Sequence, residues 1–406
     1  MRNQTNAISL LVLAAIFLSP LNLFLKWGEI NAYVGGIFSD YLLQKLWLSE
    51  IPLLLAIILW LPKKIIREKG KIILFLKKNK AWFSLLIFFI ARQFFTPLPI
   101  ISIWYLLKTI ELGLFIWCIK DNWQAINQPL LSQVLLLSLL LQITVGLLQF
   151  HRQQALFPYM ILGETQLAGT INIARANFKI GEVILPYGTT AHPNILTGTI
   201  MVTTFIWLEL RTRVKKTLGW LELIVFSLSC WLIFLTQSMT AFLAMSLFLS
   251  LQIFPKLKVF GSYLASNLLV LLPLFIFLIP ATLQTESLFR RNFLNSQAFA
   301  ISQEQPIAGV GLGLFTTTLK TPSAHFGELV RFVQPAHNVP LLLLAETGIV
   351  GLLLVFLTIK KYFWPIDAPW LVLLSVLLSL DHYLVTQWAG GVLLALILAT
   401  KTQKLR

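Results

Sequence analysis

The chain has 406 residues, of which 57% are hydrophobic and only 12% are charged. Soluble domains carry about a quarter charged residues, so this composition excludes a soluble protein, and apolar runs of membrane-spanning length recur along the chain. In a membrane protein the net charge of +16 mainly sets orientation and meets anionic lipid, so we expect a lipid bilayer around the chain and no nucleic-acid partner.

Twelve apolar runs predict an all-α polytopic membrane protein that forms a single integral membrane domain over 1–406, with both termini on one side. The runs lie at about 8–27, 43–62, 81–98, 100–119, 129–150, 194–210, 218–236, 239–255, 259–281, 340–358, 363–380 and 385–400. Two long connections between them predict outer loops at about 151–193 and 282–339.

The positions of lysine and arginine orient this layout. Of the 32 basic residues, 21 fall on the side that carries both termini, including a cluster at 63–80. By the positive-inside rule this side is cytoplasmic, so the two long loops are extracytoplasmic. We therefore expect a multi-pass protein of the cell membrane. The two cysteines, Cys118 and Cys230, lie within apolar runs and are expected to be core residues without disulfide or metal roles.

Intramembrane charge occurs in the fourth run, where Lys108 and Glu111 are three residues apart and can pair across one helical turn. Charges inside the membrane are functional candidates, but the pairing favours a structural role.

The first outer loop ends in Tyr187-Gly188-Thr189 and then His192-Pro193-Asn194 before the next helix. His192 is a second candidate base or a sugar contact, or merely part of a turn before the helix. Arg175 and Glu164 lie in the same loop, and the sequence alone does not rank them.

The second outer loop contains an arginine pair, Arg290-Arg291. If this segment is helical, Phe289 and Phe293 share one face with Ala300, whereas Arg291 shares another face with Asn295. Arg291 could reach lipid headgroups, or it could bind the diphosphate of a lipid carrier, for which the planar guanidinium fork is suited.

A glycine run follows at Gly309, Gly311 and Gly313. Such a run can present backbone N–H groups to phosphate, but this one lacks the Lys-Ser/Thr pair of a P-loop. A tight turn packed against the membrane is the better interpretation.

His337 and Asn338 stand at the beginning of an apolar helix that contains Gly348-x-x-Gly351. Asn338 can cap that helix, and Pro340 suits its first turn. The helix N-terminus favours a neutral imidazole, which can accept a proton, so His337 is a candidate general base or simply part of the cap. Further along, Asp381-His382-Tyr383 opens an outer turn that could line a catalytic cavity or close the bundle.

Several of these blocks together resemble a bacterial branch of the O-antigen ligase and polymerase superfamily. The resemblance covers about 150–400, and its most specific block is the His-Asn pair followed by Gly-x-x-Gly. It rests on Gln149-Phe150, Leu162-Gly163-Glu164, Tyr187-Gly188-Thr189, His192-Pro193-Asn194, 290–295, Pro306 with Gly309-Val310-Gly311, His337-Asn338 with Gly348 and Gly351, and Asp381-His382-Tyr383.

The resemblance implies a GT-C-like membrane glycosyltransferase of surface polysaccharide or lipopolysaccharide assembly. It implies a donor glycan on undecaprenyl diphosphate and a glycan, lipid or protein acceptor with a hydroxyl group, without cofactor, nucleotide sugar or metal. His337 matches the essential histidine of such enzymes, and Arg291 or its neighbour Arg290 matches their diphosphate-binding arginine. The substrate-binding candidates are Asn338, His192, Asn194, Arg175, Glu164, Asp381 and His382.

One position departs from that pattern. Where these enzymes usually have Ser-Arg, this chain has Ser238-Met239, so a second phosphate-binding arginine is missing. Arg92, Arg175 or Arg331 could replace it. Inversion at the anomeric carbon is expected, since attack would come from the side opposite the leaving group. The alternatives are a polymerase of the same superfamily, a transporter or flippase of lipid-linked glycans, and a non-catalytic binder.

Overall fold

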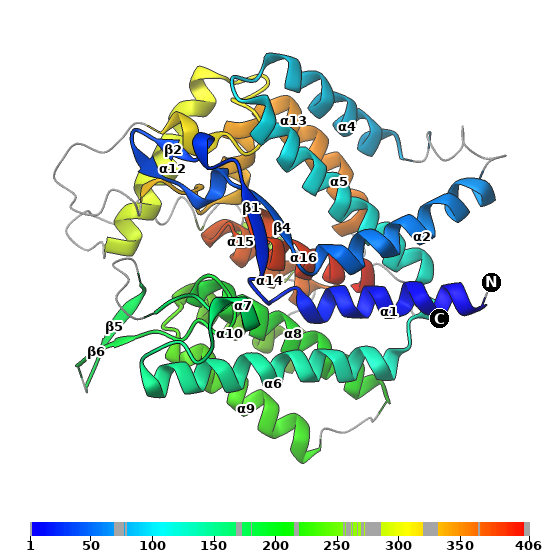
Figure 1. Ribbon diagram of the computed structural model, residues 1–406, viewed down its shortest axis with the longest axis vertical. Helices are drawn as coiled ribbons and strands as arrows, with labels where there is room; N and C mark the ends of the chain where they lie inside the picture. Colours follow the sequence, from blue (N-terminus) through cyan, green and yellow to red (C-terminus); the bar gives the residue numbers. More distant parts are fainter. Residues whose placement is uncertain are drawn as a thin grey trace.

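The computed structural model of the protein is mostly helical, and its long helices run side by side (Figure 1). It describes the chain except for residue 1 and positions 69–76, 78, 168–172, 180, 215–218, 255, 257–260, 262, 266, 269–271, 273–285, 320–331, 364–365 and 402–406. The main helices are α1 (Arg2–Leu18), α2 (Glu50–Glu68), α4 (Lys80–Arg92), α5 (Pro99–Asn122), α6 (Gln128–Arg152), α8 (Pro193–Val214), α9 (Trp220–Leu235), α10 (Met239–Ile253), α12 (Glu286–Glu304), α13 (Val339–Phe363), α14 (Ala368–Leu380) and α16 (Trp388–Lys401).

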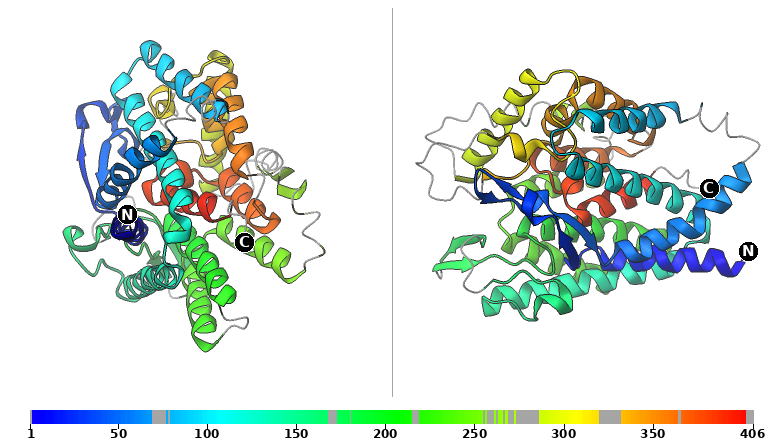
Figure 2. Two further views of the ribbon diagram at one scale, coloured as in Figure 1. Left: turned by 90° about the vertical axis from the view of Figure 1, so that its right-hand side faces the viewer. Right: turned by 45° about the horizontal axis from the view of Figure 1, so that its top comes forward.

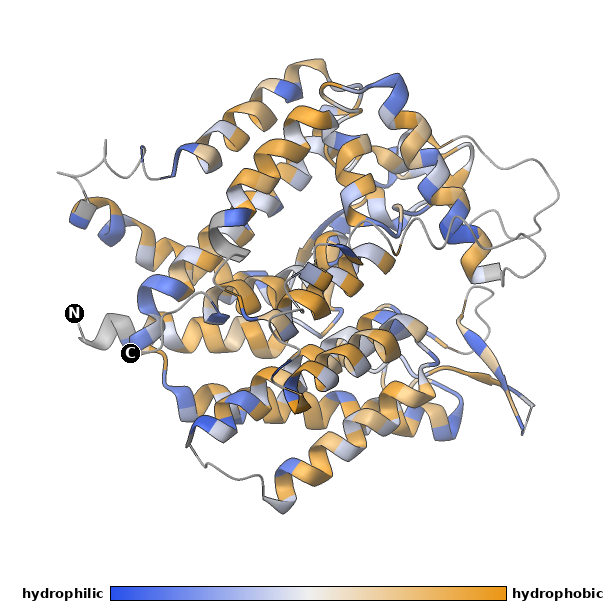
Figure 3. Cartoon of the chain, turned by 180° about the vertical axis from the view of Figure 1, so that it is seen from behind, coloured by the Kyte–Doolittle hydropathy of each residue, from blue (hydrophilic) through white to orange (hydrophobic). Residues whose placement is uncertain are grey.

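Eleven of the twelve expected apolar ranges overlap one of these helices. The remaining range, 259–281, lies largely outside the described residues. Among the described residues, three helical segments are long and apolar enough to cross a membrane, Pro99–Ala125, Gln128–Arg152 and Val339–Lys360, and five apolar helices are shorter. Apolar residues cover the helices along most of their length (Figure 3). The all-α membrane class is thus confirmed, whereas the number of twelve spans stays a prediction.

Two expected helix boundaries were wrong, and the connection between the first two long helices is therefore longer than expected. Helix α1 ends at Leu18, two residues before Pro20, although we expected it to reach residue 27. Proline cannot continue a helix that precedes it, because the residue before its ring is pushed out of the helical region. Helix α2 begins at Glu50, not at residue 43.

The chain between these two helices forms short strands rather than membrane-spanning helix. Strand β1 (Phe24–Trp27) pairs antiparallel with β4 (Gln44–Trp47), in a register that sets Phe24 opposite Trp47. Strands β2 (Tyr33–Val34) and β3 (Ile37–Phe38) form the hairpin between them. In the outer loop before α8, β5 (Arg175–Phe178) pairs with β6 (Gly181–Ile184), and a short helix α7 (Tyr159–Leu162) precedes that hairpin.

The two ends of the helix bundle differ in character. At one end lie the start of α1 and the end of α16, and at the other lie α12 and the β5–β6 hairpin (Figures 1 and 2). Ion pairs join helix ends on the terminus side: Lys64 of α2 to Asp121 of α5 at 3.0 Å, and Lys401 of α16 to Glu209 of α8. The opposite end gathers the start of α13, the end of α14 and the short helix α15 (Tyr383–Thr386).

Two apolar cores position that end. The larger one is built from α1, α5, α6, α8, α10, α14 and α16, and its fully buried side chains include Trp207 and Trp370. The smaller core packs α12 and the start of α13 on the N-terminal hairpins. Helix α12 was expected to present Phe289 and Phe293 on one face, and both rings contact Phe332, with centroids 6.4 and 5.4 Å away. That prediction is confirmed.

Candidate functional site

His337 directly precedes helix α13, and Asn338 fixes its place. The Asn338 side-chain oxygen accepts a hydrogen bond from the Leu341 N–H (2.8 Å), which is the predicted N-cap. Its amide group donates to the Ser379 carbonyl near the end of α14 (3.3 Å). Asn338 is 1% exposed, so both ends of its amide are used to join two helix ends. These contacts support a positioning role for Asn338, and they set His337 beside the turn that follows α14.

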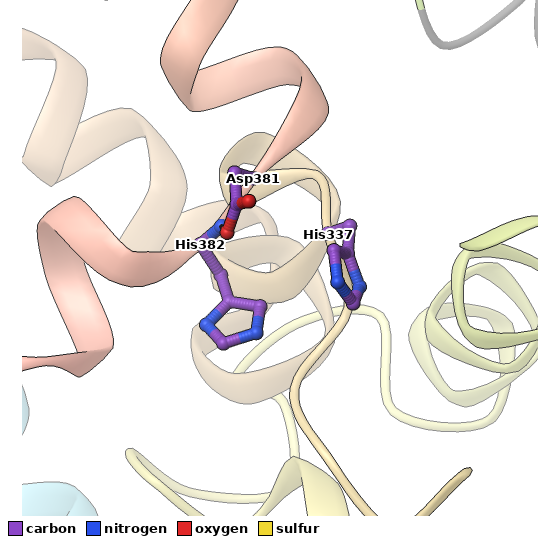
Figure 4. Close-up of side chains that lie close together, drawn as sticks. All are labelled: His337, Asp381 and His382. Atoms are coloured by element: carbon purple, nitrogen blue, oxygen red, sulfur yellow. Dashed lines mark hydrogen bonds between the residues drawn. The ribbon is translucent and has the colours of Figure 1, made fainter. Parts of the chain in front are cut away.

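His337 lies next to Asp381 and His382 (Figure 4). The two imidazole rings are 4.9 Å apart at 77°, and one ligand atom from each of the three side chains lies within 4.8 Å of the others. Asp381 receives the His382 backbone N–H on one oxygen (2.8 Å) and the Asn194 amide on the other (3.2 Å). The structure therefore brings together residues that are far apart in the sequence.

Hydrogen bonds assign the proton positions of two histidines. Thr386 donates its hydroxyl hydrogen to the His382 carbonyl (3.2 Å), so its oxygen accepts from His382 Nδ1 (2.6 Å), and Nε2 keeps its lone pair. His192 Nδ1 accepts from the Asn194 backbone N–H (3.2 Å), which leaves Nε2 as the donor of the neutral ring. His337 Nδ1 is buried without a hydrogen-bond partner in the protein. Buried polar atoms without a partner are rare in native proteins, so His337 Nδ1 is a candidate contact for a ligand atom.

Arginine adjoins the histidines from α12. The Arg291 guanidinium donates to the Thr240 hydroxyl at the start of α10 (3.2 Å). Burial lowers the pKa of Arg291, and the nearby Asp381 carboxylate opposes that effect. Arg290 lies close enough for its charge to act on His192 and His337.

This surrounding lowers the pKa of all three histidines. Burial is the main cause for His337, whose pKa falls well below 6.5, and the charges of its basic neighbours add to it. Burial likewise lowers the pKa of His382 to about 4. Desolvation by the surrounding protein and the nearby arginines lower the pKa of His192, although its ring still reaches solvent. At neutral pH the three rings are therefore uncharged, and each can accept a proton only at a cost.

The set His337, Asp381 and His382 has the composition of a metal-binding triad. Its electrostatics favour an anion instead. Both Asp381 oxygens already receive N–H donors, and the guanidinium groups of Arg290 and Arg291 repel a cation.

Two other candidate residues from the first outer loop lie in different surroundings. The buried Glu164 carboxylate accepts from the Gln149 amide (2.6 Å) and from the backbone N–H groups of Leu156 and Phe157 (3.0 Å each). Gln149 in turn accepts from the Gly188 N–H (2.8 Å). These bonds hold the loop that ends at His192. Arg175 is exposed on the β5–β6 hairpin, where it pairs with Glu182 (3.3 Å).

The glycine run packs into a break in α13. The helix is interrupted at Gly348, which has φ 62°, and the interruption frees carbonyls for partners outside the helix. The Gly311 N–H donates to the Glu346 carbonyl (2.8 Å), and the Ile349 N–H donates to the Pro306 carbonyl (2.8 Å). A Cβ at Gly348 would lie 2.3 Å from the Ile307 backbone. The tight-turn interpretation is confirmed, and it explains the glycine spacing after His337.

Arg92 supports the same turn. Its guanidinium donates to the carbonyls of Ala308 (3.3 Å) and Gly309 (2.7 Å). Of the arginines considered as a replacement for the missing one, Arg331 lies outside the described residues. Met239 is 80% exposed at the start of α10, one residue before the Thr240 hydroxyl that contacts Arg291.

Several residues around the histidines were not predicted from the sequence. Tyr41 from the N-terminal hairpin region lies edge-on to His382, with ring centroids 5.5 Å apart. Thr386 contacts His382, and Thr240 contacts Arg291. No spacing rule links these positions, because only the folded chain brings them together.

The chain was compared with known proteins. Residues 224–356 match the family model described as O-antigen ligase. The matched stretch runs from α9 into α13 and includes Arg290, Arg291 and His337. A search among curated proteins found no match. Over this stretch, about a third of the chain, the protein is therefore similar to the O-antigen ligase family, which supports the resemblance to the O-antigen ligase and polymerase superfamily.

Proposed function

We propose that the protein transfers a glycan from an undecaprenyl-diphosphate-type carrier to a hydroxyl acceptor on the outer face of the membrane. The observation that carries the proposal is the surrounding of His337. This neutral imidazole has an unpartnered Nδ1 and lies within reach of the charges of Arg290 and Arg291, in the segment that matches the ligase family.

In the proposed reaction the acceptor oxygen forms a bond to the anomeric carbon while the bond from that carbon to the diphosphate oxygen breaks. The electron pair leaves with the diphosphate, and the acceptor proton goes to His337. Arg291, with Arg290, stabilises the leaving diphosphate, because a guanidinium binds phosphate oxygens through two parallel N–H donors. The departing lipid diphosphate carries three negative charges, which the arginines stabilise, so no strong general acid is required. Displacement from the opposite side inverts the anomeric centre.

The low proton affinity of His337 fits this scheme once the donor is included. Without donor, the positive charges nearby and burial keep the pKa of His337 low. A bound diphosphate neutralises those charges, so the pKa of His337 rises when the substrate arrives. The base is thus strengthened in the complex in which it has to act.

Asp381 has a positioning role in this proposal. It holds the His382 backbone and the Asn194 amide, and it is the one carboxylate in the immediate cluster. The reaction as written needs neither metal nor cofactor, since the arginines supply the positive charge that a metal would supply elsewhere.

The orientation is part of the proposal. The histidines lie at the bundle end opposite the ion-paired basic residues Lys64 and Lys401. Since positive residues favour the cytoplasmic side, we assign the histidines to the outside and both termini to the inside. A transporter of lipid-linked glycans would instead concentrate polar groups near the midplane.

Cell-free transfer with a radiolabelled lipid-linked oligosaccharide tests the proposal. We expect purified protein in vesicles to move label from the lipid carrier to an added acceptor. Product size separates ligase from polymerase, because a polymerase joins labelled units into a ladder on the carrier. Label that crosses the bilayer while still attached to the carrier would identify a flippase. Label that stays bound without turnover would identify a non-catalytic binder.

A further inference from the structure

We propose that a cavity beside His382 binds one neutral sugar ring of the acceptor glycan. The cavity has a volume of about 70 Å³, and it lies between β4, α5 and the segment 385–388. The inference deepens the proposed function, on which its acceptor assignment rests. The binding of a sugar is a separate statement that can be tested without transfer.

Three tryptophans line the cavity: Trp47 of β4, Trp104 of α5 and Trp388 at the start of α16. Trp47 is stacked on Trp388 (5.7 Å, 14°), and Trp104 lies edge-on to Trp27 (5.0 Å). These contacts hold the indole rings in place. The faces of aromatic rings carry partial negative charge and attract the C–H groups of a pyranose.

Each cation in the same wall has a carboxylate partner. The Lys108 ammonium lies 4.4 Å from the Trp104 ring centre and pairs with Glu50 and with Glu111 (3.4 Å). Lys45 pairs with Asp40. Because both cations are paired, the cavity has no excess positive charge to attract an anionic ligand. It offers donors and acceptors to hydroxyl groups, as small-ligand sites do with a few convergent polar groups.

The size of the cavity fits one ring. Each water needs at least about 10–15 Å³ of such space, so the volume holds about five waters. The lipid chain of the donor would fit a different, apolar cavity. A cavity of about 290 Å³ lined almost entirely by apolar residues, among them Phe89, Leu112 and Leu343, lies among α4, α5, α13 and α16.

The cavity shares its wall with the histidine cluster. Tyr41 and Thr386 line it, and both contact His382, at 5.5 Å between rings and 2.6 Å between Thr386 Oγ1 and Nδ1. His382 in turn touches His337. Neither Arg290 nor Arg291, the proposed diphosphate contacts, lines this cavity. An acceptor hydroxyl attacks from the side opposite the leaving diphosphate, so we assign a ring bound away from the arginines to the acceptor.

The binding test uses Trp104→Ala, with Trp104→Phe as the conservative variant and Trp220→Ala as the matched control. Trp220 is 82% exposed at the start of α9, outside the cavity. The probe is the water-soluble oligosaccharide fraction released by mild acid and deacylation from the envelope of the producing cells. Saturation-transfer NMR on protein in nanodiscs reports its dissociation constant.

We expect Trp104→Ala to weaken binding about three- to tenfold, whereas Trp104→Phe and Trp220→Ala stay near wild type. Equal binding by Trp104→Ala and wild type overturns the sugar site. If Trp104→Ala does not fold, Thr109→Phe takes its place, since Thr109 lines the same cavity and a larger ring would fill it. Unchanged binding in that variant also overturns the proposal.

The assignment to the acceptor has its own readout. In the transfer assay we expect the KM for acceptor to rise in Trp104→Ala while the KM for the lipid donor is unchanged. A rise in the donor KM alone would move the ring to the donor glycan and overturn the acceptor assignment. If wild-type protein transfers nothing, the proposed function fails, but the NMR titration still decides whether the cavity binds sugar.

Discussion

Two groups of ionisable side chains lie near His382, and they differ in how their positive charges are paired. Beside the tryptophan-lined cavity each cation has a carboxylate partner: Lys108 with Glu50 and Glu111, Lys45 with Asp40. In the histidine cluster the basic groups outnumber the carboxylates. There the residues are His192, His337, His382, Arg290 and Arg291, with Asp381 beside them.

This difference indicates what each region is suited to bind. A set in which every cation is paired offers no free positive charge to an anion and can take a neutral ligand. An unbalanced set lowers the pKa of its own histidines and is relieved when an anion arrives. The same comparison distinguishes a charge that holds helices together, at Lys108, from a charge proposed to bind a ligand, at Arg291. The sequence alone could not make that distinction.

The largest effect is expected at His337. Replacement with Ala or Gln should lower transfer about 10²–10⁴-fold, which is the usual cost of removing a general base. Donor binding should persist, because the guanidinium groups remain. His151→Gln is the matched control, since His151 lies exposed near the end of α6, outside the cluster. Retained transfer in His337→Ala would refute the assignment of the base.

Arg291→Lys comes next. We expect a loss of about 10- to 100-fold in kcat/KM for the donor, since an ammonium keeps the charge but not the two parallel donors. Arg152→Lys is the control, because Arg152 is exposed near the end of α6. Steady-state kinetics with varied lipid donor measures the change. A larger loss in Arg290→Lys than in Arg291→Lys would move the main phosphate contact to Arg290.

The ion pairs of Lys108 should contribute to the thermal stability of the protein. Lys108→Met leaves two carboxylates in a mostly buried setting, and breaking such a set costs about 3–5 kcal/mol. We expect a lower thermal unfolding midpoint in detergent. The triple variant with Glu50→Gln and Glu111→Gln removes the unpaired charges and should recover most of the loss. Equal midpoints for Lys108→Met and wild type would show that the pairing contributes nothing.

Activity should depend on pH through His337. The base works when neutral, and its pKa in the free protein is lowered from 6.5, so kcat/KM should stay level from pH 8 to 6.5 and fall only at lower pH. The midpoint for kcat should lie higher than that for kcat/KM, because bound diphosphate raises the pKa. Activity that rises on acidification, together with function in His337→Arg, would instead make His337 a proton donor to the diphosphate.

The sequence predicted the elements that carry local signals. The cap at Asn338, the amphipathic helix with Phe289 and Phe293, and the pair Lys108–Glu111 were all predicted and are all present. Each depends on spacing within one helix, which sequence periodicity reports directly.

The rest depended on contacts between distant segments. Residues 24–27 and 43–47 were taken for the ends of two membrane spans, because hydropathy cannot tell a buried strand from a helix. Tyr41 lies in the connection between those ranges and belongs to no motif, so its contact with His382 was missed. The partner of Gly348 could not be predicted either, because the turn at 306–313 that fills the helix break is chosen by packing. The ion pair between Glu50 and Lys108 could not be predicted, because it forms only where α2 packs beside α5.

The smallest effect is expected from metal removal, and it tests the unbalanced region most directly. His337, Asp381 and His382 could hold a divalent cation by composition and spacing. The positive charge of Arg290 and Arg291 makes this unfavourable, and both Asp381 oxygens already accept N–H donors that position the turn. Transfer after exhaustive dialysis against EDTA should equal that of untreated protein.

Asp381→Asn gives the matched comparison. If Asp381 only positions the His382 backbone and Asn194, an amide oxygen can still accept one of those bonds, so a moderate loss is expected. If Asp381 were a metal ligand, the variant and the EDTA-treated wild type would fail alike, and added Zn²⁺ would restore only the wild type. That pair of results would show that His337, Asp381 and His382 bind a metal ion rather than an anion. Equal activity with and without EDTA, joined to a moderate loss in Asp381→Asn, leaves the excess positive charge for the diphosphate.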